Sequence, residues 1–244
     1  MVRARLLITV VVIVVLAVVA VAAARTPAAS SLSVNETPLA AGAPTALSLR
    51  TTFDRSTRGE LSAVEVDLAR GFHFDPRAAD VCSNAQARAA TCPQASTVGL
   101  GQGTIVVQGR YLPRTPYSVG ATLYLAEARH PGDIAGLVLD FYETESQLHA
   151  TIFGRVVPLP HGPYGIALRF SAANTELPSG YDLSLLALTT VLQAHRTAIV
   201  NNHDVAYDLL TNPNACRRGG WPVQLQIRSG GRLQGYRSNA ACAP

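Results

Sequence analysis

Short runs in which apolar and polar residues alternate recur over most of this chain. In residues 61–68, for example, valine and leucine alternate with glutamate and aspartate, a period-two pattern typical of a strand with one buried and one solvated face. The other runs of this kind are residues 47–53, 104–108, 121–126, 137–141, 149–157, 166–170, 181–188 and 223–227. This alternation limits the chain to a mainly β fold with antiparallel pairing.

About ten short strands, with no long amphipathic helix between them, argue against βαβ units and favour an antiparallel β-sandwich of two packed sheets. Residues 229–232, Ser-Gly-Gly-Arg, predict a tight hairpin. Ser83 and Gln86 match a capping box and predict one short helix, ended by Pro93. Residues 190–210 fit neither a helix nor a single strand, so we expect an irregular crossover there.

The N-terminus predicts export. Arg3 and Arg5 precede an uncharged apolar segment, residues 6–24, which Arg25 follows. The spacing of Ala20, Ala22 and Ala24 suits a signal peptidase and favours cleavage as a signal peptide. The length of the apolar segment, however, suffices for a membrane-spanning anchor. Both alternatives stay open, and in both the bulk of the chain lies outside the cytoplasm because positive charge stays inside.

Amino-acid composition distinguishes residues 26–46 from the rest of the chain. Residues 26–46 are rich in Ala, Pro, Ser and Thr without periodicity, which is typical of a flexible linker. We therefore expect a signal peptide or signal anchor in residues 1–25, a flexible linker in residues 26–46 and one β-sandwich domain in residues 47–244. If it is not cleaved, the N-terminal helix in residues 6–24 makes the membrane a partner.

The four cysteines form an even set behind an export signal, which favours two disulfides over free thiols or metal ligands. Three connectivities are possible, and we expect sequential pairing, Cys82 with Cys92 and Cys216 with Cys242, because each pair closes a local loop. No C-x-x-C motif occurs and no histidine stands beside either pair, so the sequence predicts no metal site.

The charge pattern excludes nucleic acid as a partner. All 20 basic residues are arginine, three of them in residues 1–25, and the rest are dispersed among 16 acidic residues. A nucleic-acid interface needs clustered basic residues. The expected partner is an envelope component or an extracellular ligand.

No nucleophile elbow, phosphate-binding glycine motif or metal-binding histidine motif occurs in the sequence. The most polar cluster is His203 with Asp204, and Glu143 with Glu145 is a second acidic pair. A histidine beside an aspartate can exchange protons with a substrate, so these four residues are the candidates for catalysis. Trp221 is expected in the core, and no cofactor is expected.

Three groups of residues resemble sequence motifs of a known protein family. They are Gly71-Phe72 before Cys82, the segment Cys92-Pro93-Gln94-Ala95-Ser96-Thr97-Val98-Gly99, and Thr211-Asn212-Pro213 before Cys216 with the closing Cys242. Together they resemble a family of uncharacterised exported proteins of high-GC bacteria. The resemblance implies an extracytoplasmic β-rich module with local disulfides and no established activity, which occurs here as a single copy.

These observations favour a non-catalytic module of the cell envelope, used for adhesion, ligand binding or structural presentation. The alternative is a secreted hydrolase whose site assembles only in three dimensions, from His203, Asp204, Glu143 and Glu145.

Overall fold

The computed structural model describes residues 30–53, 61–109, 116–144, 147–176, 181–229 and 231–243. Within these ranges no helix is long and apolar enough to cross a membrane. The apolar segment predicted at residues 6–24 lies outside the described residues.

The chain is mainly β, as predicted, and each predicted run falls in a strand to within one residue. Its helical segments are short: η1 (Pro76–Ala78), α2 (Asn84–Arg88) and η2 (Gln94–Ser96). The strands are β1 (Ser31–Thr37), β2 (Ala46–Thr52), β3 (Leu61–Ala69), β4 (His73–Phe74), β5 (Thr97–Gly109), β6 (Pro116–Ala126), β7 (Ala135–Glu143), β8 (Leu148–Pro158), β9 (Tyr164–Glu176), β10 (Tyr181–Leu192), β11 (His195–Val200), β12 (His203–Asp208), β13 (Leu210–Thr211), β14 (Trp221–Ser229) and β15 (Arg232–Ala240).

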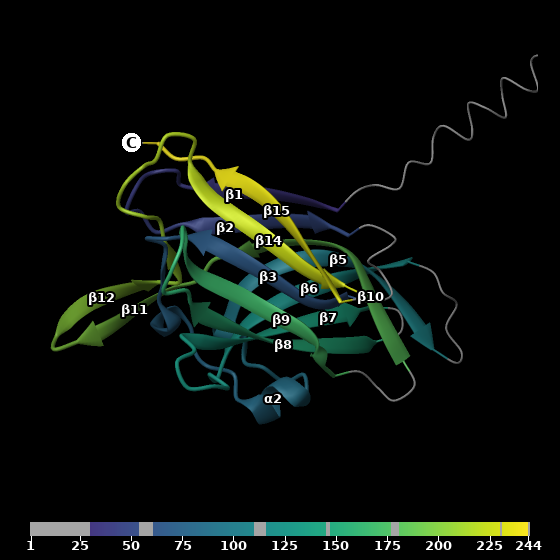
Figure 1. The fold of residues 1–244 in the computed structure, drawn as a ribbon. Helices are drawn as coiled ribbons and strands as arrows, with labels where there is room; N and C mark the ends of the chain where they lie inside the picture. Colours follow the sequence, from purple (N-terminus) through teal and green to yellow (C-terminus); the bar gives the residue numbers. More distant parts are fainter. Residues whose placement is uncertain are drawn as a thin grey trace, which may run out of the picture.

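Eleven strands form one antiparallel sheet in the order β1-β2-β10-β5-β6-β7-β8-β9-β3-β14-β15. The sheet curls until its edge strands, β1 and β15, lie side by side (Figure 1), so it is nearly closed into a barrel. The predicted two-sheet sandwich was wrong in this respect. A sandwich and a curled sheet both bury one face of every strand, so the same alternation of apolar and polar residues suits either arrangement.

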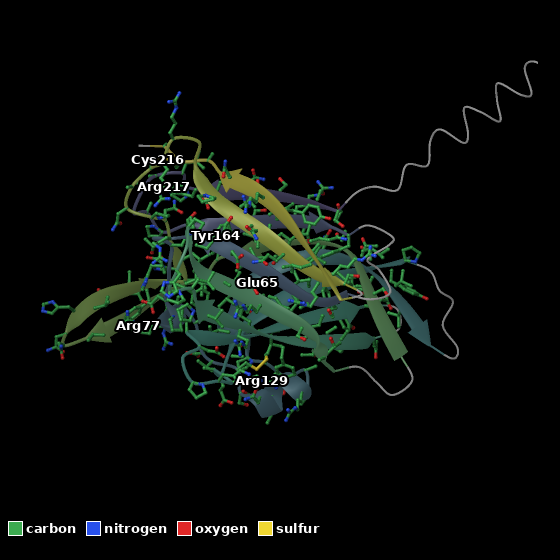
Figure 2. All side chains as sticks on the ribbon, viewed as in Figure 1. Glu65, Arg77, Arg129, Tyr164, Cys216 and Arg217 are labelled. Atoms are coloured by element: carbon green, nitrogen blue, oxygen red, sulfur yellow. A yellow bond between two sulfur atoms is a disulfide. The ribbon has the colours of Figure 1, made fainter. Side chains whose placement is uncertain are left out.

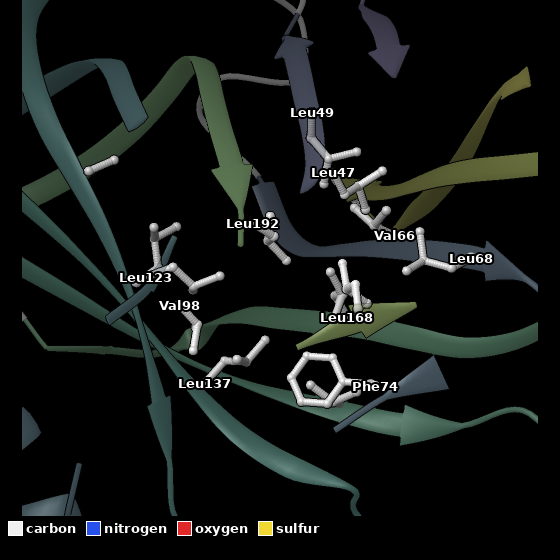
Figure 3. Packing of buried hydrophobic residues seen from close by; sticks show 14 of the residues in the cluster. Leu47, Leu49, Val66, Leu68, Phe74, Val98, Leu123, Leu137, Leu168 and Leu192 are labelled. Atoms are coloured by element: carbon white, nitrogen blue, oxygen red, sulfur yellow. The ribbon is translucent and has the colours of Figure 1, made fainter. Parts of the chain in front are cut away.

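The inner face of the curled sheet holds the hydrophobic core. Leucine and valine side chains from β2, β3, β5, β6, β7, β9 and β10 converge there with Phe74 (Figure 3). Burial of one such side chain contributes roughly 1.5–3 kcal/mol. The core therefore joins strands that are far apart in the sequence.

The short strands β4 and β13 pair with each other at one end of the barrel, where Phe74 and Leu210 join the core together with Trp221. Trp221 is buried, as predicted, and its Nε1 donates a hydrogen bond of 2.9 Å to the carbonyl of Ala215. Its ring meets Phe72 edge-on, with the ring centroids 5.8 Å apart. The second disulfide, Cys216–Cys242, forms beside this end, which confirms the predicted pairing.

The β11–β12 hairpin replaces the irregular crossover expected in residues 190–210, and it projects from the sheet (Figure 1). Asn201 and Asn202 have positive φ angles of 52° and 61°, which suit the two-residue turns that match strand twist. The base of the hairpin is held by an ion pair of 2.6 Å between Arg196 and Asp80. The turn at Asn201 and Asn202 thus determines the hairpin conformation, which hydrophobic periodicity alone did not identify.

The sheet also extends into the segment expected to be a linker. Residues 31–37 form β1, which pairs along its whole length with β2. The strand turns Val34 and Glu36 inward, where both are buried. The hairpin predicted at residues 229–232 is confirmed by the pairing of Ser229 with Arg232.

Glu36 is a buried acid within this core. Its side chain is 4% exposed, and neither carboxyl oxygen has a hydrogen-bond partner among the described residues. Burial raises the pKa of Glu36 from its ordinary value of 4.5 to about 7. The folded state therefore holds a proton on Glu36 over a pH range in which the unfolded chain releases it.

Ionisation of Glu36 should make stability pH-dependent. Because folding raises the pKa of Glu36, its protonated side chain contributes fully to the free energy of unfolding below about pH 4.5. This contribution is lost as the pH rises to about 7. We expect Glu36→Gln to reduce the loss of unfolding free energy between pH 5 and pH 8, by on the order of 3 kcal/mol. Urea unfolding at both pH values measures this. Asp204→Asn, at an exposed position, is the control, and an equal slope in Glu36→Gln and wild type would contradict the prediction.

Candidate functional site

The structure does not bring the predicted polar residues into one site. His203 and Asp204 are exposed at the start of β12, in the projecting hairpin. Glu143 is buried at the end of β7, in the main sheet. Glu145 lies outside the described residues. The acidic residue and the histidine therefore belong to different sheets and different environments.

A small lobe closed by the Cys82–Cys92 disulfide carries the only described α-helix, and both features were predicted. Ser83 and Gln86 form the capping box, with the Ser83 backbone N–H donating to Gln86 Oε1 at 3.0 Å and the Gln86 N–H donating to Ser83 Oγ at 3.2 Å. The helix ends at Arg88, earlier than Pro93. The bridge and the cap together fix a very short helix.

The lobe packs on the outer face of the sheet. Cys82 and Ala87 contact Ala126, Val138 and Phe153 in a second, smaller apolar cluster. Phe153 faces outward as the cross-strand partner of Val138 in the continuous β7–β8 ladder. On its other side, the β8–β9 register shifts between Ile152 and Gly154. An apolar patch on the outer face is thus covered by the disulfide lobe, and a pocket forms at its border.

Gly154 is required where the register shifts. A Cβ at this position would lie 2.5 Å from the Phe170 ring and 2.8 Å from the Arg169 carbonyl. Close approach of backbone and ring leaves room for glycine alone.

The pocket has a volume of about 570 Å³, within the usual range for sites that bind small molecules. Figure 2 shows Arg129 beside the α2 lobe, at the opposite end of the molecule from Cys216 and Arg217. We call this site the Arg129 pocket. It is lined by Asn84, Arg88, Ala128, Arg129, His130, Phe153, Gly154 and Arg155.

Packing and hydrogen bonds hold the basic side chains of the pocket in place. The Arg129 guanidinium carbon lies 3.9 Å from the centre of the Phe153 ring, and its Nε donates to Asn84 Oδ1 at 3.2 Å. Asn84 Nδ2 in turn donates to Glu127 Oε2 at 2.9 Å. Arg155 is steadied by Asp133, whose Oδ1 lies 3.7 Å from Arg155 Nε. Arg129 is therefore oriented before any ligand arrives.

A polar network adjoins the pocket on the outer face of β9, β3 and β14, where Figure 2 shows Glu65. Arg169, the cross-strand neighbour of Arg155, donates from Nε and Nη2 to the Glu65 carboxylate at 2.8 and 3.0 Å. Gln226 Nε2 donates to Asp67 Oδ2 at 2.6 Å. Burial raises the pKa of Asp67 to about 6. These side chains pair with one another across the strands.

Two histidine–aspartate pairs occur that the sequence did not indicate. His149 Nδ1 lies 3.2 Å from Asp140 Oδ2, and burial raises the pKa of Asp140. On the hairpin, His195 Nδ1 lies 2.7 Å from Asp208 Oδ1. Both pairs join neighbouring strands, and neither lines the Arg129 pocket. In the described ranges no group of three or more His, Cys, Asp or Glu residues could hold a metal ion.

Sequence reasoning did not find the Arg129 pocket because its residues come from separate segments. They belong to α2, the β6–β7 connection and β8, and no local motif links them. The nearest signal was the predicted disulfide-bracketed helix, which supplies one wall.

Comparison with known proteins identifies no relative: no family model, no curated protein and no solved structure matches the chain. The resemblance to exported proteins of high-GC bacteria therefore stays a prediction.

Removal of the two disulfides should have spatially separate effects. We expect the double substitution of Cys82 and Cys92 by Ala to speed amide exchange in residues 82–92 and 127–130, because the lobe that walls the pocket loses its closure. The same change at Cys216 and Cys242 should affect residues 39–42 and 216–243. The expected loss of unfolding free energy is roughly 3 kcal/mol for each bridge. Hydrogen–deuterium exchange of the two variants measures this, and identical exchange patterns would contradict it.

Proposed function

We propose that the chain is a non-catalytic module of the cell envelope, working outside the cytoplasm, that binds a ligand in the Arg129 pocket. The two disulfides support an oxidising compartment. The apolar segment at residues 6–24 supports export, either by cleavage or as an anchor. The antiparallel β framework supplies rigid elements for binding.

One observation carries the binding proposal: a concave site whose guanidinium groups are oriented by Phe153, Asn84 and Asp133. The residues that line it include no serine, threonine, cysteine or carboxylate. Nucleophilic catalysis needs such a hydroxyl, thiol or carboxylate beside a base, and His130 is the one potential base in the lining. The pocket is therefore suited to holding a molecule and offers no nucleophile to act with His130.

A secreted hydrolase is the alternative, and one geometry favours it. Asp208, His195 and Thr197 form a hydrogen-bonded series in which His195 Nε2 lies 3.4 Å from Thr197 Oγ1. The order of groups matches that of an acid, a base and a hydroxyl nucleophile. All three lie on the projecting hairpin, with His195 and Thr197 exposed, so water has open access to the series.

A steric variant tests the binding proposal without altering charge. Ala128 is exposed and lines the pocket, so Ala128→Trp should fill it. We expect thermal-shift screening of the full chain against neutral and charged envelope components to give ligands whose binding Ala128→Trp abolishes. Ala206→Trp, at an exposed position on the hairpin, should retain binding.

Two results would count against this proposal. If no ligand is lost specifically in Ala128→Trp, the pocket is not a binding site. If the chain hydrolyses ester substrates and Thr197→Ala removes the activity, the hydrolase is the correct function.

A further inference from the structure

We infer that the Arg129 pocket recognises an oxyanion, a carboxylate or a phosphate group, carried on a small organic body. This inference rests on the proposed function and names the chemical class of its ligand.

The lining of the pocket is basic. Three of its eight residues are arginine, a fourth is His130, and none is acidic. Over the whole sequence, basic and acidic residues are nearly balanced, with 20 against 16. Three guanidinium groups around one hollow are therefore a local concentration of positive charge, and low-dielectric walls strengthen its attraction for an anion.

Two acidic residues contact lining residues of the pocket, and both already have partners. Asp133 accepts from the backbone N–H of His130 at 3.3 Å and faces Arg155. Glu127 accepts from the backbone N–H and the side-chain amide of Asn84, at 3.3 and 2.9 Å. Neither carboxylate is among the lining groups. They orient basic and amide side chains and leave the hollow itself to a ligand.

Arg129 is the residue best placed to bind an anion. Its single hydrogen bond within the described residues uses Nε, so both Nη groups are left for a ligand. The contact with the Phe153 ring fixes the plane of the guanidinium. Two parallel N–H groups in a fixed plane match the paired oxygens of a carboxylate or phosphate.

The size of the site indicates more than a bare ion. A volume of about 570 Å³ falls within the range that holds organic ligands. Gly154 contributes backbone atoms to the lining. The amide of Asn84 also lines the pocket and can contact a polar body such as a sugar ring.

Isothermal titration calorimetry of the full chain with inorganic phosphate, glucuronate, glucose 6-phosphate and glucose tests the inference. We expect glucuronate or glucose 6-phosphate to bind at least tenfold more tightly than inorganic phosphate, and glucose to show no binding. Stronger binding of glucuronate identifies a carboxylate as the recognised group, and stronger binding of glucose 6-phosphate identifies a phosphate. Affinity should fall with added salt, because charge attraction is screened.

Matched variants locate the binding. Arg129→Gln should lower the affinity at least tenfold, and Arg129→Lys should recover only part of it because a single ammonium lacks the paired geometry. Arg237→Gln, on β15, removes an arginine that donates to Gln224 outside the pocket and should change the affinity less than twofold. Arg88→Gln, on an exposed residue, replaces Arg129→Gln if the latter fails to fold.

The outcomes separate this inference from the proposed function. If the ligands that bind are neutral and Ala128→Trp abolishes their binding, the oxyanion inference is overturned and the proposed binding function stands. Equal losses in Arg129→Gln and Arg237→Gln would show unspecific attraction of anions and also overturn it. Absence of any ligand sensitive to Ala128→Trp would overturn both.

Discussion

Burial of a single continuous face holds this molecule together. The strands of the curled sheet turn alternate side chains into one shared core, and within the described residues no second sheet packs against that face. The curl itself brings those faces together, since eleven strands would otherwise leave a broad apolar surface in water. The outer face is then left for polar pairing, such as that of Arg169 with Glu65, and for the lobe that carries one wall of the pocket.

The residues that suggested a protein family serve the fold. Gly71 has a φ of +105°, and a Cβ there would lie 2.9 Å from Pro213, so the Gly-Phe and Asn-Pro segments meet in space. Asn212 Nδ2 donates to the carbonyls of Pro38 and Ala40, which ties the β1–β2 connection to the end of the barrel. Ser96 is buried, and its hydroxyl donates to the Pro93 carbonyl at 2.6 Å. These residues stabilise the fold, and none of them lines the Arg129 pocket.

Sequence patterns were informative wherever a structure depends on neighbouring residues. The nine predicted runs of alternating residues, the Ser83 capping box and the two short-range disulfides follow from local spacing, and all are present. Closure of the sheet was not predictable, because alternation does not encode which strands become neighbours. β1 is as long as β2 but was missed, because one of its inward positions is the acidic Glu36 and it lies in a stretch of linker-like composition. The pocket was missed for a related reason, since Arg88, Arg129 and Arg155 come together only when the lobe docks on the outer face of the sheet.

The unjoined seam between β1 and β15 has a mechanical meaning. β1 is held along its length by the β2 ladder on one side, while β15 marks the other end of the strand order and meets it without a continuous ladder. A pulling force applied to the chain ahead of residue 30 therefore acts first on the β1–β2 hydrogen bonds. The ten other strands of the sheet and the pocket would bear load only after β1 had separated from β2.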